Sequence, residues 1–134
     1  MIDRRTDYAL RCLLCLARKG DASPLPAAEL SRKLKISRVF AAKILQTLAS
    51  AGIVRMERGR LGGARLLSKK VNVLRVIRLF EPDHALNKCL NHKYHCFMEK
   101  SCPLHRFFLK LQRELEREFK AMTIERLVKG GGKQ

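Results

Sequence analysis

The chain is organised around Ala27-Ala-Glu-Leu-Ser-Arg-Lys-Leu34-Lys-Ile-Ser37-Arg-Val-Phe-Ala-Ala-Lys43-Ile-Leu-Gln-Thr-Leu48, which predicts two short helices. Residues 27–34 form the first helix, and Lys35-Ile36 is a brief break. Ser37 is a good N-cap for the second helix, because its hydroxyl can accept a hydrogen bond from the first helical turn. This spacing is typical of a helix-turn-helix. The core-facing side chains of the second helix are predicted to be Val39, Ile44, Leu45 and Leu48.

The start of the second helix is where DNA would be contacted, because a recognition helix presents its N-terminal residues to base edges and phosphates. The candidate DNA contacts are Ala28 in the first helix and Ser37, Arg38, Phe40, Ala41 and Lys43 in the second. An ordinary surface helix with a solvated basic face would show the same pattern. These residues alone leave both interpretations open.

A β-hairpin is predicted directly after the helix pair. Residues 51–57 read as a helix stop and a strand, and Leu66-Leu67 ends a second strand. Between them lies Arg58-Gly59-Arg60-Leu61-Gly62-Gly63, whose glycines permit positive φ in a tight turn. Arg58, Arg60 and Arg65 would place charge at its tip, so the hairpin is interpreted as a wing that reaches the minor groove. A glycine turn with solvated arginines is the alternative.

The charge of the chain points to the same class of partner. The 134 residues include 29 Lys and Arg against 12 Asp and Glu, a formal net charge of +17, and 46% are hydrophobic, enough for a real core. Binding of such a chain to a polyanion is favoured by counterion release, so nucleic acid is the expected partner. We find no apolar run of about 18 residues, no signal-peptide pattern and no lipidation motif, so no membrane partner is expected and the protein is predicted to be cytoplasmic.

The first helix is predicted near residues 7–19, where apolar residues recur at helical spacing. It contains Cys12 and Cys15 in a C-x-x-C arrangement. A redox pair is one interpretation, but both cysteines lie in a leucine-rich helical pattern, which favours core packing.

The remaining three cysteines lie in residues 82–102, here called the cysteine loop. Six residues separate Cys89 from Cys96, and five separate Cys96 from Cys102. An odd total of five cysteines in a reducing compartment argues against a disulfide framework and for metal or redox chemistry. Zinc sites usually place two ligands two to four residues apart, so this looser spacing favours an iron–sulfur cluster. Buried or disulfide-bonded cysteines are the alternative.

The second half of the chain is predicted to be helical on both sides of the cysteine loop. Residues 71–80 are mostly apolar and predict a largely buried segment that Pro82 ends. A long amphipathic helix follows the loop, with a stripe formed by Leu104, Phe108, Leu111, Leu115, Phe119 and Met122. Such a helix is about 30 Å long, more than a small domain covers, so we expect a homodimer along residues 103–122. Packing back on its own domain is the alternative.

These elements predict a mainly α fold with a small β-hairpin wing, a winged helix-turn-helix followed by a long dimerisation helix. The predicted divisions are a DNA-binding domain at 1–81, the cysteine loop at 82–102, and the dimerisation helix with a short C-terminal helix at 103–128. Thr123 is the expected cap of the short helix. Residues 129–134 are glycine-rich and predicted to be disordered.

Several motifs together resemble the IscR/NsrR (Rrf2-type) family of winged-helix iron–sulfur transcription regulators, over residues 1 to about 128. They are Thr6-Asp7-Tyr8-Ala9-Leu10-Arg11, Ala51-Gly52-Ile53-Val54, the sequence from Arg58 to Gly63, the three loop cysteines, and Thr123-Ile124-Glu125-Arg126-Leu127-Val128. Two features depart from the family pattern. The first cysteine gap is one residue longer, and Ala64 stands where an aromatic residue often follows the glycines.

The resemblance implies specific site residues. Cys89, Cys96 and Cys102 would ligate a [2Fe-2S] or [4Fe-4S] cluster, with His105 or Asp7 as the fourth ligand. The family's carboxylate ligand can come from the second protomer. The helix from Ser37 would enter the major groove. The wing residues implied in DNA binding are Arg58, Gly59, Arg60, Gly62 and Gly63.

The resulting functional hypothesis is a dimeric transcription regulator, a repressor by default, whose promoter affinity is switched by a cluster that senses nitric oxide, redox state or iron supply. Two alternatives remain. The same cysteines could bind zinc or sense thiol oxidation directly in a winged-helix regulator, or the chain could be a thiol enzyme using Cys12 and Cys15. The prediction is that the chain is not an enzyme.

Overall fold

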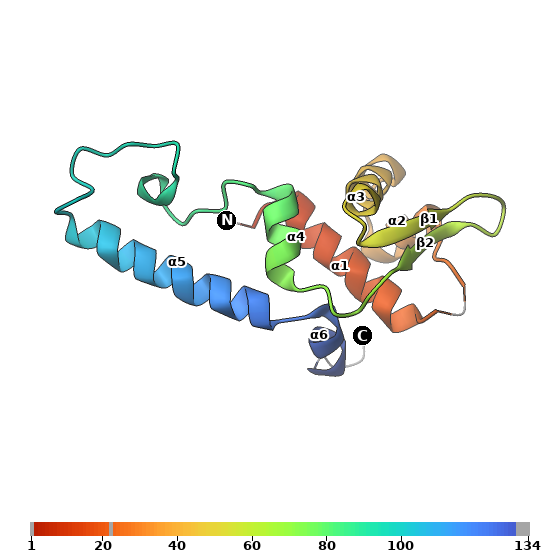
Figure 1. The fold of residues 1–134 in the computed structure, drawn as a ribbon. Coiled ribbons are helices and arrows are strands. Elements are labelled where there is room, and N and C mark those ends of the chain that lie inside the picture. The colour runs from red at the N-terminus through yellow and green to blue at the C-terminus, as the bar shows by residue number, and fades with distance from the viewer. Residues whose placement is uncertain (1, 22, 131–134) are drawn as a thin grey trace.

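A computed structural model describes residues 2–21 and 23–130 of the chain. Most of the helices pack together, one antiparallel hairpin projects from their edge, and a long helix extends away on the opposite side (Figure 1). This confirms the predicted fold class. The elements are α1 Arg4–Lys19, α2 Ala27–Leu34, α3 Arg38–Ser50, β1 Val54–Glu57, β2 Gly63–Leu66, α4 Val73–Phe80, the short 3-10 helix η1 Lys88–Leu90, α5 Pro103–Ala121 and α6 Ile124–Gly130.

The helix pair has the predicted boundaries. Lys35 ends α2 in the left-handed conformation, with φ 56° and ψ 46°. Ser37 caps α3, where its Oγ accepts a hydrogen bond from the Phe40 N–H at 3.1 Å. The core stripe of α3 is formed by Ala41, Ile44, Leu45 and Leu48. The prediction that Val39 faces the core was wrong, because steps of three and four residues back from Leu48 reach Ala41, and Val39 is 65% exposed.

Helix α1 begins earlier than predicted because Asp3 caps it. The Asp3 carboxylate accepts a hydrogen bond from the Thr6 N–H at 2.9 Å. Cys12 is fully buried in the core that α1 shares with the other helices, which confirms the prediction of core packing for this residue. Cys15 is half-buried and packs against the same core.

The hairpin is short and is anchored at its base. Strand β1 pairs with β2 from Val54 opposite Leu66 to Glu57 opposite Gly63. Leu25 adds a bridge through two hydrogen bonds with Ala64, of 3.0 and 2.9 Å. Gly63 lies directly against the backbone of Leu25 and has φ 156°. A Cβ at this position would collide with the Leu25 carbonyl. Gly63 therefore belongs to the strand, and the wing tip spans residues 58–62.

The C-terminal part of the chain returns to the core. Helix α4 buries Val73, Leu74, Val76, Ile77 and Phe80, as predicted for residues 71–80. Thr123 caps α6 by accepting a hydrogen bond from the Arg126 N–H at 3.1 Å. Ile124 is fully buried and packs α6 into the same core. Helix α6 continues to Gly130, so residues 129–130 are helical where disorder was predicted, and residues 131–134 lie outside the described ranges.

Helix α5 is covered far less than the rest of the molecule. Between residues 81 and 123, all of which are described, Gln112 is the only buried side chain. Leu104 and Phe107 are 61% and 54% exposed. In the single chain the apolar stripe is only partly covered, because Leu104 is exposed while Phe108, Leu111, Leu115, Phe119 and Met122 are half-buried. Packing of α5 on its own domain therefore stays an alternative to the dimer.

Candidate DNA-binding surface and cysteine loop

The N-terminal end of α3 presents some of the predicted contacts and buries others. Ser37, Arg38 and Lys43 are exposed. Phe40 is half-buried because its ring packs edge-on against Tyr8 of α1, with centroids 5.9 Å apart. The prediction that Ala41 contacts DNA was wrong, because Ala41 is fully buried.

Two further cations support this end of α3 from α1. The Arg4 guanidinium lies 4.6 Å from the Phe40 ring centroid and 5.3 Å from that of Tyr8. Arg11 lies 5.4 Å from the Tyr8 ring. Arginine stacks favourably on aromatic faces. The sequence pattern does not connect these α1 residues with the recognition helix, because the contact is made only by the packed helices.

The outward face of α3 contains residues that the sequence interpretation missed. The exposed side chains opposite the core stripe are Val39, Ala42, Lys43 and Gln46. A helical projection from Leu48 and Ile44 identifies this face. Ala28 is half-buried on α2, and its carbonyl accepts a hydrogen bond from the Ser31 hydroxyl at 2.9 Å.

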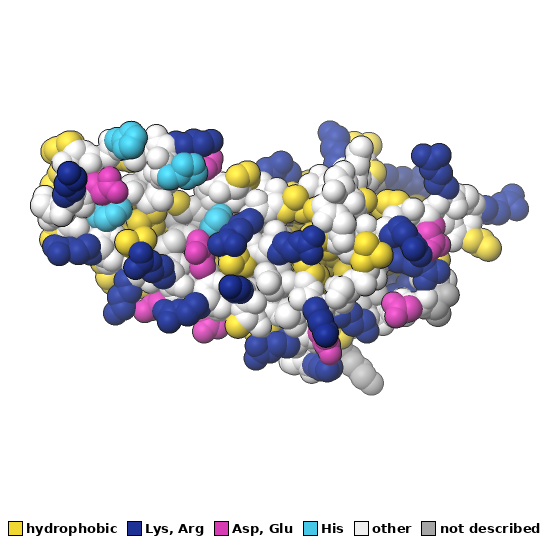
Figure 2. Space-filling model, viewed as in Figure 1, with side chains coloured by type: hydrophobic (Ala, Val, Ile, Leu, Met, Phe, Trp, Pro, Cys, Tyr) yellow, Lys and Arg dark blue, Asp and Glu magenta, His cyan; other side chains and the backbone are white. Residues whose placement is uncertain are grey.

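The wing separates two kinds of arginine. Arg58 and Arg60 are exposed beside Gly59, which has φ 103°. Arg65 instead pairs with Glu57 across the strands at 2.6 Å, so the expectation that it charges the tip was wrong. The hydrogen bond from Arg65 lowers the pKa of Glu57 below its ordinary value. Figure 2 shows Lys and Arg side chains projecting around the wing end of the molecule.

The three cysteines of the cysteine loop are half-buried and unbonded to one another. Cys89 lines a cavity of about 360 Å³ together with His92, His95, Glu99 and His105. In the described ranges, no three Cys, His, Asp or Glu side chains converge closely enough to hold a metal ion. The loop must therefore close further for its thiolates to share one metal centre.

His105, in the first turn of α5, has a buried nitrogen without a hydrogen-bond partner among the described residues. Its side chain is 15% exposed, and Nε2 lies 3.8 Å from a Glu99 carboxylate oxygen. Nδ1 is buried and has no hydrogen-bond partner among the described residues. A buried polar atom left in this way costs about 1–3 kcal/mol. Three thiols and a free imidazole nitrogen have the donor chemistry that fits an iron–sulfur cluster.

Asp7, the other candidate for a fourth ligand, lies elsewhere in the single chain. It belongs to the first turns of α1, and its carboxylate pairs with Arg11 at 3.0 Å. Asp7 is not among the residues that line the cavity containing Cys89.

The Cys12 and Cys15 thiols are poorly suited to redox chemistry. Burial and the neighbouring Cys15 raise the pKa of Cys12 to about 12. Burial also raises the pKa of Cys15, against the lowering influence of Lys33 and Arg18. The thiolate is the reactive form of cysteine, so both thiols are weak nucleophiles at neutral pH.

Comparison with known proteins identifies the family of this chain. Residues 2–130 match the Rrf2 family, described as "Iron-dependent Transcriptional regulator". The chain belongs to the Rrf2 family. The predicted family is thereby confirmed, and membership of a family of transcriptional regulators is consistent with the prediction that the chain is not an enzyme.

Named relatives give this Rrf2 protein a sequence neighbour and two fold neighbours. It is 35% identical over 102 residues to the HTH-type transcriptional regulator NsrR of Bacillus licheniformis, covering 74% of this chain and 71% of NsrR. CymR, the global cysteine regulator of B. subtilis, superposes with a TM-score of 0.82 at 20% identity and covers 98% of both chains. IscR of T. potens gives 0.72 at 18% identity, covering 100% of this chain and 93% of that one. At such identities the solved structures establish the winged-helix fold alone.

One further observation concerns membranes. Among the helices of the described residues, none is both long enough and apolar enough to span a bilayer.

Proposed function

We propose that this Rrf2-family regulator is a homodimeric, DNA-binding repressor whose promoter affinity is switched by an iron–sulfur cluster. The observation that carries the proposal is the buried, unpartnered Nδ1 of His105 in the same cavity wall as Cys89. This nitrogen has no hydrogen-bond partner in the part of the chain that the structure describes, so in the tautomer with the proton on Nε2 its lone pair is available to a ligand. Coordination of iron would satisfy it.

The ligands of the proposed cluster are Cys89, Cys96 and Cys102, with His105 as the favoured fourth ligand over Asp7 of the second protomer. When bound, a [2Fe-2S] or [4Fe-4S] cluster would supply iron that reacts with nitric oxide or oxidants, or that is lost when iron is scarce. These ligands would hold the cysteine loop in one geometry while the cluster is bound, and the loop would be released when the cluster is lost. Repression then changes only if the two geometries have different DNA affinities.

The proposed DNA contacts come from three places. Helix α3 contributes its N-terminal end and outward face, and the wing contributes its exposed tip. The proposed set comprises Ser37, Arg38, Val39 and Lys43 of α3, Arg58, Gly59, Arg60 and Gly62 of the wing, and Ala28 of α2 at the edge. The prediction that Gly63 contacts DNA was wrong, because Gly63 is buried against the Leu25 backbone. Phe40 acts indirectly, because its ring holds α3 against α1.

The proposed dimer forms along α5. Its exposed face includes a groove of about 710 Å³ lined by residues such as Leu111, Leu115 and Ala121. A second copy of α5 would bury this apolar stripe and would bring two recognition helices onto successive turns of DNA. The domain division that follows is DNA binding at 1–81, sensing at 82–102 and dimerisation at 103–128, in a protein of the cytoplasm.

Zinc is a second candidate for the same loop. The cavity that contains Cys89 is also lined by His92, His95, Glu99 and His105, which is a mixed sulfur, nitrogen and oxygen donor set. Zinc accepts such ligands in tetrahedral sites. In that case the switch would respond to zinc or to direct thiol oxidation.

Anaerobic purification tests the proposal and separates the two metals. The wild-type protein is expected to be brown, with iron and sulfide in the preparation, and replacing Cys89, Cys96 or Cys102 by Ser abolishes the chromophore. The matched controls Cys12→Ser and Cys15→Ser retain it. Colourless wild-type protein that contains zinc would support the second candidate. Full iron and sulfide in all three loop variants would contradict both.

The fourth ligand is tested in the same preparation. His105→Ala is expected to change the visible spectrum and speed cluster loss in air, whereas Asp7→Ala leaves both unchanged. The reverse result would assign the ligand to Asp7 and require donation across the dimer.

A further inference from the structure

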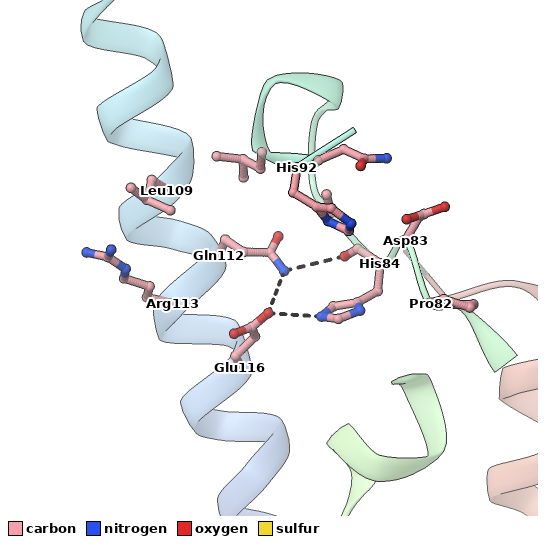
Figure 3. A pocket seen from close by; sticks show the side chains of 11 residues that line it. Pro82, Asp83, His84, His92, Leu109, Gln112, Arg113 and Glu116 are labelled. Atoms are coloured by element: carbon pink, nitrogen blue, oxygen red, sulfur yellow. Dashed lines mark hydrogen bonds and ion pairs between the residues drawn. The ribbon is translucent and has the colours of Figure 1, made fainter. Parts of the chain in front are cut away.

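The single buried side chain of α5 is polar. Gln112 is 7% exposed and faces residues 81–87, here called the connector, which follow α4 and form the stem of the cysteine loop (Figure 3). Its Oε1 accepts a hydrogen bond from the Leu86 N–H at 2.9 Å. Its Nε2 donates to the His84 carbonyl at 3.4 Å and to Glu116 at 3.1 Å. The Gln112 amide thus holds the backbone of the connector, at a point that lies three residues before Cys89.

Glu116 and His84 complete this arrangement. His84 Nε2 lies 2.9 Å from Glu116 Oε1, so one carboxylate oxygen is shared by His84 and Gln112. The second oxygen of Glu116 lies 3.9 Å from Arg78 of α4. Burial acts to raise the pKa of Glu116, but the hydrogen bonds from Gln112 and His84 and the charges of His84 and Arg78 lower it overall. Glu116 is therefore an ionised acceptor that joins α4, the connector and α5.

The connector continues these contacts into the DNA-binding part. His84 Nδ1 lies 3.3 Å from the backbone carbonyl of Glu81. The Glu81 carboxylate accepts a hydrogen bond from the buried Thr6 hydroxyl at 2.7 Å and from the Asp3 N–H at 3.2 Å. These two residues begin α1, beside Arg4, whose guanidinium stacks on Phe40 of α3. A continuous set of contacts thus runs from α5 to the recognition helix.

We propose that His84, Gln112 and Glu116 form a clamp that positions the stem of the cysteine loop and couples its closure to the recognition helix, a role that rests on the proposed function. An apolar residue at position 112 could fill the same space, but only an amide fixes the Leu86 N–H and the His84 carbonyl in one direction. A cavity of about 270 Å³ beside the clamp leaves room for the connector to shift when the loop closes. Packed networks with two arrangements carry coupling of this kind.

The test compares cluster-loaded and cluster-free protein on one duplex. In the wild type the two DNA affinities are expected to differ by roughly 5–150-fold, and in Gln112→Met they converge to within about twofold while iron and sulfide contents are retained. Lys110→Met, an exposed change on the same helix, keeps the wild-type ratio. A purely structural role would lower thermal stability or cluster content but leave the affinity ratio unchanged.

A second variant tests the far end of the same contacts, in case Gln112→Met folds poorly. Thr6→Val keeps the shape of a fully buried side chain and removes the hydrogen bond to Glu81. The affinity ratio is expected to fall in this variant too, although Thr6 lies outside the cysteine loop. An unchanged ratio in both variants with the cluster intact overturns the clamp. Wild-type protein without iron, or with equal affinities in both forms, overturns the proposed function and the clamp's role together.

Discussion

The winged-helix body, residues 2–80, and the region from the connector to α5, residues 81–123, differ in how much side-chain surface they bury. Residues 2–80 place a continuous apolar core between α1, α3, α4 and the hairpin, to which α6 adds Ile124. Residues 81–123 bury one side chain, and it is an amide. The body therefore obtains its fold from its own sequence. The sensing and dimerising region has an open apolar helix and a loop of metal-binding side chains, so its final geometry depends on what binds to it.

The two regions also differ in charge. Residues 1–81 contain 18 Lys and Arg against 6 Asp and Glu, whereas residues 82–134 contain 11 against 6. If DNA binds to the body, the cations that matter for affinity lie in the first region. Four measurements test this difference between the two regions.

The largest expected effect is that of salt on DNA affinity. A dimer that neutralises six to ten phosphates loses about 10³–10⁵ in affinity between 50 and 200 mM salt. Lys43→Gln and Arg60→Gln in the body should each reduce the slope of log affinity against log salt by about two, because each change removes one phosphate contact from both protomers of the dimer. Lys100→Gln and Lys110→Gln should leave the slope unchanged. A flat salt profile in the wild type would remove the body's charge from the DNA interface.

The next effect is on stability. Leu45 is fully buried, so Leu45→Ala should lower the free energy of unfolding by about 2–5 kcal/mol. Leu115 is half-exposed on α5, so Leu115→Ala should change the unfolding of dilute protein much less and should instead weaken the dimer. Urea denaturation and sedimentation at several concentrations measure the two effects. Equal destabilisation at low concentration would mean that α5 is covered within its own chain.

The body was the more predictable region for a physical reason. Its helices were predicted to within a few residues because burial imposes the 3.6-residue period directly on the sequence. Val39 and Ala41 were assigned to the wrong faces because both are apolar, so residue type alone does not distinguish them; the helical period through Ile44 and Leu48 places Ala41 in the core. Arg65 was misplaced because its partner Glu57 lies across the hairpin, and cross-strand register is not visible in a run of arginines.

The sensing region could be predicted by chemistry but not by geometry. Cysteine spacing indicates a metal loop, yet closing the loop depends on a metal and a second chain that the sequence does not contain. The clamp went unnoticed because Gln112 and Glu116 read as ordinary polar positions of an amphipathic helix. Only the packed structure shows that Gln112 faces the connector.

A smaller effect is expected from the wing. Arg58→Ala should weaken binding to a specific duplex by roughly 1–3 kcal/mol if the guanidinium reads the groove. Arg65→Ala is the matched control, because it removes the ion pair with Glu57 and the hydrogen bond to the Asp21 carbonyl but leaves the tip intact. Binding of each variant is compared on the specific and a scrambled duplex. Equal losses on both duplexes would make Arg58 a phosphate contact.

The smallest expected effect concerns Val39, which the structure moves from the core to the outward face of α3. Exposed apolar side chains on a recognition helix can contact the methyl group of thymine. Because burial of one methylene contributes about 0.8 kcal/mol, Val39→Ala should weaken binding by roughly 1 kcal/mol at a single base pair. Val39 is 65% exposed, so the free energy of unfolding should stay unchanged.

Deoxyuridine identifies that base pair, since it lacks only the thymine methyl. A duplex that the protein selects from a random library is remade with each thymine replaced in turn, and wild type and Val39→Ala are measured on every duplex. Where Val39 touches a methyl, the two losses are not additive, because either change removes the same contact. Full additivity at every thymine would show that Val39 reads no methyl, and the outward face of α3 would then depend on Lys43 and Gln46 for its specificity.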